Sequence, residues 1–384
     1  MTYQIKIPSC VFAGTGSIKE LEVILKKEET KKVLIFTDKG VIGAGLLKGL
    51  LEVLESVQVQ YEIFEDLKPE PAYQDVERVV EEVNKSEGDL IVAIGGGSVM
   101  DAAKLCSLLK NSDYSVKDLL ENPLLADKKM KTVMIPTTCG TGAEATCNAI
   151  VAIPEEQSKK GIVNDNMIPD YVILDSQTIA GLPSKIVAAT GVDALAHVVE
   201  CFTSKKATPL SDTYALAGAK LIFRNIEEAY QNPNNMEAKN NMMLGAFYGG
   251  VAITGSGTTA VHALSYPLGG KYHIAHGVSN AILFAHVMAF NKDACKERLA
   301  VLCDAVYPEF SEKSEEEKAD YIIQRIAEIV KNTDIPTDLN TFGVKMDDLE
   351  FLVDAGSKQQ RLLVNNRKEL SLEDIRSIYL KVLK

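Results

Sequence analysis

The sequence predicts an α/β domain built on a parallel sheet, followed by an all-helical domain. Short apolar, β-branched runs alternate with amphipathic helical stretches through the first 180 residues, and such runs almost vanish after Pro183. Strand–helix alternation is typical of a parallel sheet with helices on both faces. The chain has 384 residues, and single cores rarely grow beyond about 250–300 residues. We therefore expect one domain over residues 1–180 and a second over residues 181–384.

The strands of the first domain are expected where apolar or alternating runs end in Gly, Pro or polar residues. These runs are residues 33–36, 58–63, 90–94, 133–135, 148–153 and 171–174. Apolar residues recur with helical periodicity between them, at residues 76–83 and 101–109.

The second domain is expected to consist of helices. The pattern predicts them at residues 184–201, 208–230, 236–252, 278–289, 294–306, 315–331 and 371–383. Ser371 and Asp374 suit a capping box at the start of the last helix. Pro267, Gly269 and Gly270 are expected to break a helix after His262.

Composition and charge exclude several classes of function. The net charge of −12 argues against binding to nucleic acid or to an anionic membrane surface. The N-terminus lacks the apolar run of a signal peptide, and no stretch approaches the roughly 18–20 continuous apolar residues of a membrane span. The seven cysteines form no CxxC pair, and their number is odd. We expect reduced thiols and a cytoplasmic protein that binds small molecules.

A glycine-rich turn follows the expected strand at residues 90–94. It reads Gly95-Gly96-Gly97-Ser98 and leads into a helix that contains Asp101. Glycines let the backbone approach a ligand closely, and a helix N-terminus favours a phosphate. The alternative is a tight turn without a ligand. The position between a buried strand and a helix favours a nucleotide.

Two other strand ends carry polar residues. Asp38 follows the strand at residues 33–36, where a carboxylate can accept hydrogen bonds from a ribose and repel a 2′-phosphate. This favours NAD over NADP, although Asp38 could also be a plain helix or turn cap. The loop after residues 133–135 contains Thr137, Thr138 and Thr141, which suit the second wall of the nucleotide site.

All five histidines lie between His197 and His286, and three of them join Asp193 in a metal-ligand pattern. Asp193 and His197 are four residues apart and would share one face of a helix. His262 and His276 are expected to converge on the same point across the break near Pro267. Carboxylate and imidazole together suit a divalent cation of borderline or hard character. The alternative is that these residues are buried structural groups, as His286 is expected to be.

At these residues the chain resembles the iron-containing (group III) alcohol dehydrogenase family. The resemblance rests on residues 95–104, 136–144, 191–197 and 276–280, and it runs over nearly the whole chain. It implies a dinucleotide-binding α/β domain and an all-helical domain, an architecture shared with dehydroquinate synthase-like enzymes. It also implies that Asp193, His197, His262 and His276 are the metal ligands.

The resemblance implies further roles for the cofactor-binding residues. Residues 95–98 would hold the pyrophosphate of NAD, and Asp101 in the following helix is a further cofactor-binding candidate. Asp38 matches the acid that excludes NADP. Thr137, Thr138 and Thr141 would line the path from adenine to nicotinamide, and Lys160 would reach a ribose. The metal would be Fe²⁺, although the ligands also accept Zn²⁺, Mn²⁺ or Co²⁺.

The chain departs from the family pattern at two places. Many members have a second histidine four residues after the third ligand, where this chain has Tyr266. His273 could take over proton transfer, since it precedes His276 by three residues. Many members also have Pro-Asn-Pro where this chain has Pro69-Glu70-Pro71. The carboxylate of Glu70 could alter substrate choice or lie on the surface.

The expected function is hydride transfer between NAD(H) and a small primary alcohol or aldehyde, aided by a metal. The main alternative is an enzyme like glycerol dehydrogenase or dehydroquinate synthase that acts on a polyol or a sugar-derived substrate. A homodimer is expected.

Overall fold

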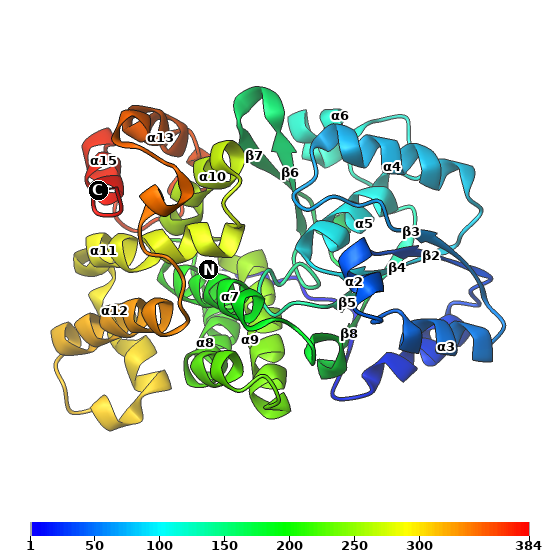
Figure 1. Ribbon diagram of the computed structural model, residues 1–384, viewed down its shortest axis with the longest axis horizontal. Helices are drawn as coiled ribbons and strands as arrows, with labels where there is room; N and C mark the ends of the chain where they lie inside the picture. The colour runs from blue at the N-terminus through cyan, green and yellow to red at the C-terminus, as the bar shows by residue number, and fades with distance from the viewer. Residues whose placement is uncertain (1, 384) are drawn as a thin grey trace. The chain divides into compact units, whose positions relative to one another are not determined.

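A parallel sheet forms the centre of the N-terminal part of the chain (Figure 1). The computed structural model describes residues 2–383. Residues 1 and 384, the outer limits of the two predicted domains, lie outside the described residues. Within it the sheet has six strands in the order β1-β8-β5-β4-β2-β3, and all neighbouring strands are parallel. The strands are β1 (Cys10–Ala13), β2 (Lys32–Phe36), β3 (Gln60–Phe64), β4 (Leu90–Gly95), β5 (Lys131–Pro136) and β8 (Tyr171–Leu174).

Helices cover both faces of the sheet, as the alternating pattern predicts. Val33 and Ile35 of β2 pack with α1 (Leu21–Lys27) and α3 (Lys48–Ser56). The alternate residues Leu34 and Phe36 pack on the other face with α4 (Tyr73–Lys85) and α5 (Gly97–Leu109). Successive side chains of a strand point to opposite faces, so one short strand serves both cores. The remaining helices are α2 (Lys39–Gly43) and α6 (Val116–Glu121).

The C-terminal part of the chain is helical from Pro183 onward, as expected (Figure 1). Its helices are α7 (Ser184–Thr203), α8 (Pro209–Gln231), α9 (Met236–Ser256), α10 (Ala260–Tyr272), α11 (His276–Val306), α12 (Glu315–Asn332), α13 (Leu349–Ser357), α14 (Gln360–Leu363) and α15 (Leu372–Leu380). Helix α7 contacts α8, α9 and α11. Among the described residues, α7 alone is long and apolar enough to cross a membrane, but 83% of its most apolar window is buried inside the protein.

The chain divides into two units, and the main division falls between Leu182 and Pro183. The α/β unit comprises residues 6–154 and 159–182. The helical unit comprises the remaining C-terminal residues together with residues up to Ile5 and residues 155–158. Residues 155–158 comprise part of the link that follows β6 (Asn148–Ile153) and the first residue of β7 (Ser158–Val163); these two strands pair in a small sheet of their own.

The predicted helix break at residues 267–270 is wrong. Helix α10 continues through Pro267, and it ends at His273, whose backbone is left-handed with φ of 54°. Gly270 has a different purpose, because a Cβ atom there would lie 2.3 Å from the carbonyl oxygen of Gln157. The glycine therefore permits a close approach of two backbones instead of ending the helix. The two helices predicted at 278–289 and 294–306 correspond to α11, in which non-helical backbone at Cys295 separates two helical segments.

Candidate metal centre and dinucleotide-binding turn

Helix α7 carries two of the predicted metal ligands on one buried stripe. Asp193, His197 and Glu200 are spaced i, i+4 and i+7, so their side chains follow the same face of the helix. All three are at most 5% exposed. This stripe faces residues of α10 and α11, which supply His262 and His276.

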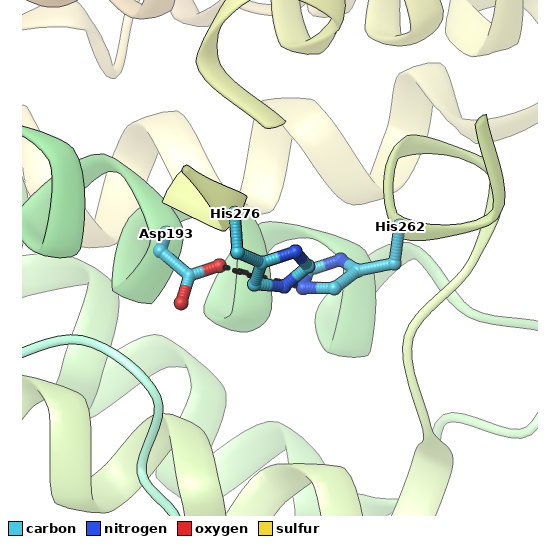
Figure 2. Close-up of side chains that lie close together, drawn as sticks. All are labelled: Asp193, His262 and His276. Carbon is cyan, nitrogen blue, oxygen red and sulfur yellow. Dashed lines mark ion pairs between the residues drawn. The ribbon is translucent and has the colours of Figure 1, made fainter. Parts of the chain in front are cut away.

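The three histidines present the same nitrogen to one carboxylate oxygen. The Nε2 atoms of His262, His276 and His197 lie 3.5, 3.6 and 3.8 Å from Oδ1 of Asp193. Figure 2 shows the rings of His262 and His276 converging beside Asp193. The ligand atoms of Asp193, His262 and His276 all lie within 4.8 Å of one another, and His197 lies outside this group of three. The ring of His197 stacks on that of His262, with centroids 4.6 Å apart.

This arrangement fits a divalent metal. Metal–nitrogen bonds of about 2.1 Å in a tetrahedral site would separate neighbouring ligand atoms by roughly 3.4 Å. The distances from Asp193 Oδ1 to the three Nε2 atoms are close to that separation. One anionic oxygen with neutral imidazoles is also the donor set expected for Fe²⁺, Zn²⁺, Mn²⁺ or Co²⁺.

The charges in the cluster influence one another strongly. Burial alone would raise the pKa of Asp193, but the neighbouring His197 and His276 hold it well below its usual range. Burial alone would lower the pKa of His262, yet the carboxylates of Glu200 and Asp193 outweigh burial and raise it to about 9. The cluster therefore stabilises positive charge next to the buried carboxylates.

His276 is the most accessible of the four predicted ligands. Its side chain is 28% exposed, whereas that of Asp193 is 3% exposed. It is the first residue of α11, and the next residue is Gly277. A Cβ atom on Gly277 would lie 2.0 Å from the carbonyl oxygen of Ala189 on α7. The missing side chain therefore lets α11 begin against α7, which brings His276 to Asp193.

Sequence reasoning missed two polar residues that contact the ligands. Glu200 is fully buried and pairs with Nδ1 of His262. The amide Nδ2 of Asn280 donates to Asp193 Oδ1 at 2.7 Å and lies 3.2 Å from Nε2 of His262. Helical spacing could have revealed both, because Glu200 follows His197 by three residues and Asn280 follows His276 by four.

The glycine-rich turn lies where the sequence predicts, between β4 and α5. Gly95 ends the strand, Gly96 caps the helix and Gly97 begins it. The first N–H groups of α5 therefore face the turn without partners from their own helix. This geometry suits a phosphate.

The threonine loop adjoins this turn. Gly95 of β4 and Pro136 of β5 are in register, so the loops that follow them leave the same edge of the sheet. A Cβ atom on Gly97 would lie 2.8 Å from Cγ2 of Thr141, and one on Gly96 would lie 3.7 Å from Cγ2 of Thr138. Thr137 is buried. The two loops are thus neighbours, and the nucleotide site that they would line stays a prediction.

Asp38 and Asp101 both have partners within the fold. Oδ1 of Asp38 accepts hydrogen bonds from the N–H groups of Gly40 and Val41, so this residue caps α2. Asp101 accepts from Lys104 through Oδ1 and from the N–H of Ile150 through Oδ2. These contacts give Asp101 a structural role, and a cofactor role for either residue stays a prediction.

The remaining predicted site residues lie in different surroundings. His273 is exposed at the end of α10, and Lys160 is exposed on β7. Tyr266 is 5% exposed, with its ring centroid 6.0 Å from that of His276. Glu70 forms an ion pair with the buried Lys159, at 2.6 Å.

Models of known protein families match both parts of the chain. The model for iron-containing alcohol dehydrogenase matches residues 8–176, and the model for the C-terminal part of the Fe-containing alcohol dehydrogenase family matches residues 187–383. The chain belongs to the iron-containing alcohol dehydrogenase family. This membership confirms the predicted fold class, the oxidoreductase assignment and the cofactor pair of NAD and a metal of the iron type. It favours alcohol dehydrogenase over the alternative of a dehydroquinate synthase-like enzyme.

Individual relatives agree with this family assignment. The long-chain-alcohol dehydrogenase 1 of Geobacillus thermodenitrificans is 34% identical over 98% of this chain and 95% of its own length. The NAD-dependent methanol dehydrogenase of Bacillus methanolicus is 32% identical over 90% of this chain and 91% of its own length. A crystal structure of 1,3-propanediol oxidoreductase matches with a TM-score of 0.95 at 27% identity and covers 100% of both chains.

Proposed function

We propose that this dehydrogenase transfers a hydride between NAD(H) and a small primary alcohol or aldehyde, at a divalent metal held by Asp193, His197, His262 and His276. The observation that supports this most is the meeting of three imidazole Nε2 atoms at one oxygen of a buried carboxylate. Fe²⁺ is the first candidate because of the family, and the donor set also suits Zn²⁺, Mn²⁺ and Co²⁺.

The side chains of the cluster would divide the work. When bound, the metal would act as a Lewis acid on the substrate oxygen, and NAD would accept or donate the hydride. Asp193 provides a fixed negative charge, which its buried position and Asn280 keep in place. The partial exposure of His276 marks the side of the cluster from which a substrate can approach. The buried ring of Tyr266 lies beside His276, with the two ring centroids 6.0 Å apart.

The α/β unit would hold the cofactor. Backbone N–H groups of residues 96–98, at the start of α5, would bind the pyrophosphate. The hydroxyl groups of Thr138 and Thr141 would contact the cofactor beside them, and Lys160 would reach a ribose. His273 would exchange the reaction's proton with solvent, which its exposed position at the end of α10 allows.

We also propose that the enzyme is a cytoplasmic homodimer. All seven cysteines are free thiols, which suits a reducing compartment. The outer edge of β1 is a candidate contact, because β1 ends the sheet and Val11 on it is 37% exposed. Sedimentation of the purified enzyme would test the dimer.

A panel of small aldehydes tests the activity. Protein stripped of metal by a chelator should not oxidise NADH in the presence of short aldehydes, and reloading with Fe²⁺, Zn²⁺, Mn²⁺ or Co²⁺ in turn should restore turnover. Asp193→Asn and His262→Ala should each lower kcat/KM by about a thousand-fold, because Lewis-acid stabilisation contributes several kcal/mol. His286→Ala is the matched control and should leave turnover within about twofold. Full activity in the metal-free protein would contradict the proposal.

A further inference from the structure

Glu200 is a buried carboxylate that links helix α7 to the start of helix α10. Its side chain is 0% exposed. Oε1 accepts hydrogen bonds from the N–H of Thr259 at 3.1 Å, the hydroxyl of Thr259 at 2.7 Å and the N–H of Val261 at 2.8 Å. The other oxygen, Oε2, pairs with Nδ1 of His262. Glu200 thus caps α10 through one oxygen and holds a predicted metal ligand through the other.

Every group that faces Glu200 in this network can donate a hydrogen bond. An ionised carboxylate only accepts hydrogen bonds, and three donors already converge on Oε1. Nδ1 of His262 must therefore carry the hydrogen that points to Oε2. In a neutral imidazole the lone pair then belongs to Nε2, the nitrogen that lies 3.5 Å from Asp193 Oδ1.

We infer that Glu200 is a positioning residue that fixes the tautomer and orientation of His262 so that Nε2 faces the metal. This inference rests on the proposed metal site. Carboxylates that hold the second nitrogen of a metal-bound histidine raise its basicity and keep its ring in place. Helix α7 therefore carries two of the proposed ligands, Asp193 and His197, and positions a third, His262, through Glu200.

Replacement by glutamine would reverse this hydrogen bond. In Glu200→Gln the amide oxygen can keep the three donors that face Oε1 only if the amide NH₂ turns toward His262. Nδ1 of His262 must then become the acceptor, which moves the hydrogen to Nε2 and removes the lone pair a metal needs. Replacing one carboxylate oxygen by an NH₂ group therefore gives the wrong tautomer.

The experiment is a titration of the metal-free enzyme with Zn²⁺ in competition with a chelating dye. We expect Glu200→Gln to weaken Zn²⁺ binding by about 10- to 100-fold. Thr259→Ala is the matched control, because it removes one donor to Oε1 and leaves Oε2 alone; its Zn²⁺ affinity should stay within about twofold of wild type. In a His262→Ala background, Glu200→Gln should cause no further loss. Equal losses in both backgrounds, or no loss in the single variant, would overturn the inference.

A second measurement does not depend on the folding of any variant. In the wild-type enzyme loaded with Zn²⁺, ¹⁵N NMR of histidine-labelled protein should show His262 protonated at Nδ1 and metal-bound at Nε2. A signal for the opposite tautomer would refute the role of Glu200. The proposed function fails separately: it fails if Asp193→Asn and His262→Ala bind Zn²⁺ as tightly as wild type does.

Discussion

The backbone N–H of Glu70 donates a hydrogen bond of 2.9 Å to Oγ of Ser98, in the glycine-rich turn. The same residue pairs its carboxylate with Lys159, which is 5% exposed, and has a left-handed backbone with φ of 51°. Glu70 thus ties the loop between β3 and α4 both to the cofactor turn and to β7.

Replacing Glu70 by glutamine should mainly affect stability. The change leaves the buried ammonium of Lys159 without its partner, so the free energy of unfolding should fall by about 1–2 kcal/mol; the loss is smaller than for a fully buried pair because Glu70 is partly exposed. The contact with Ser98 comes from the backbone, so the KM for NAD should change by less than about twofold. Urea unfolding and steady-state kinetics measure the two effects. A large rise in KM with unchanged stability would show instead that the carboxylate acts on the cofactor.

Asp38→Asn separates helix capping from cofactor choice. Asparagine caps helices as well as aspartate does, so α2 should keep its start and the melting temperature should not change. The loss of the negative charge should reduce the preference for NADH over NADPH by about tenfold, which corresponds to 1.4 kcal/mol. The ratio of the two kcat/KM values measures this. Asp38→Ala is the comparison: it should also lower the free energy of unfolding by about 1 kcal/mol through loss of the cap. An unchanged ratio in both variants would leave Asp38 as a cap only.

Gly277→Ala should disturb the start of α11. The added Cβ would lie 2.0 Å from a backbone oxygen of α7, and backbone cannot move aside as a flexible side chain can. Overpacking of this kind costs about 1–3 kcal/mol, and we expect weaker Zn²⁺ binding as well, because His276 would shift. Gly43→Ala is the control, since a Cβ there meets no atom within 4 Å. Stability and Zn²⁺ affinity equal to wild type in Gly277→Ala would show that the two helices can separate without cost.

Glu144 should make stability depend on pH. Burial raises its pKa from 4.5 to about 7, so the folded protein keeps a proton that the unfolded chain releases. Its contribution is fully present below about pH 4.5 and is lost as the pH rises toward about 7. The difference of roughly 2.5 pKa units corresponds to about 3 kcal/mol. Urea unfolding at a series of pH values should show this decline in wild type and a flatter profile in Glu144→Gln. If the two proteins lose stability equally as the pH rises, Glu144 is not the group responsible for the decline.

The sequence predicted the sheet well, and it placed Asp193 and His197 on one helix face, because both depend on simple spacing; metal binding by these residues stays a prediction. The buried strands at β4 and β5 are apolar runs, and Asp193 and His197 occupy one helix face by their spacing alone. The strand β1 went unrecognised because four residues, Cys10–Ala13, are too few to show a pattern. The seven-residue helix α1 was missed for the same reason, since it has only about two turns.

The errors have physical causes as well. Pro267 and Gly270 normally end helices, but a helix can contain them when tertiary contacts supply the stability, and here Gly270 meets the backbone at Gln157. The two carboxylate oxygens of Asp101 accept hydrogen bonds from Lys104 and Ile150, and its predicted cofactor role stays a prediction. Helical spacing places Glu200 on the same face as His197, but its contact with His262, 62 positions away in the chain, could not be read from the sequence.

Two neighbouring residues at the start of β7 belong to different units. Ser158 groups with the helical unit, where its Oγ accepts a hydrogen bond of 3.1 Å from Nε2 of Gln359, whereas Lys159 groups with the α/β unit. No single cut in the chain can therefore separate the two units cleanly. A recombinant fragment that stops at Leu182 would carry residues 155–158 without their usual neighbours, and the complementary fragment would lack them. Attempts to express the halves independently, or to exchange them between related enzymes, should carry this short turn along with the helical half.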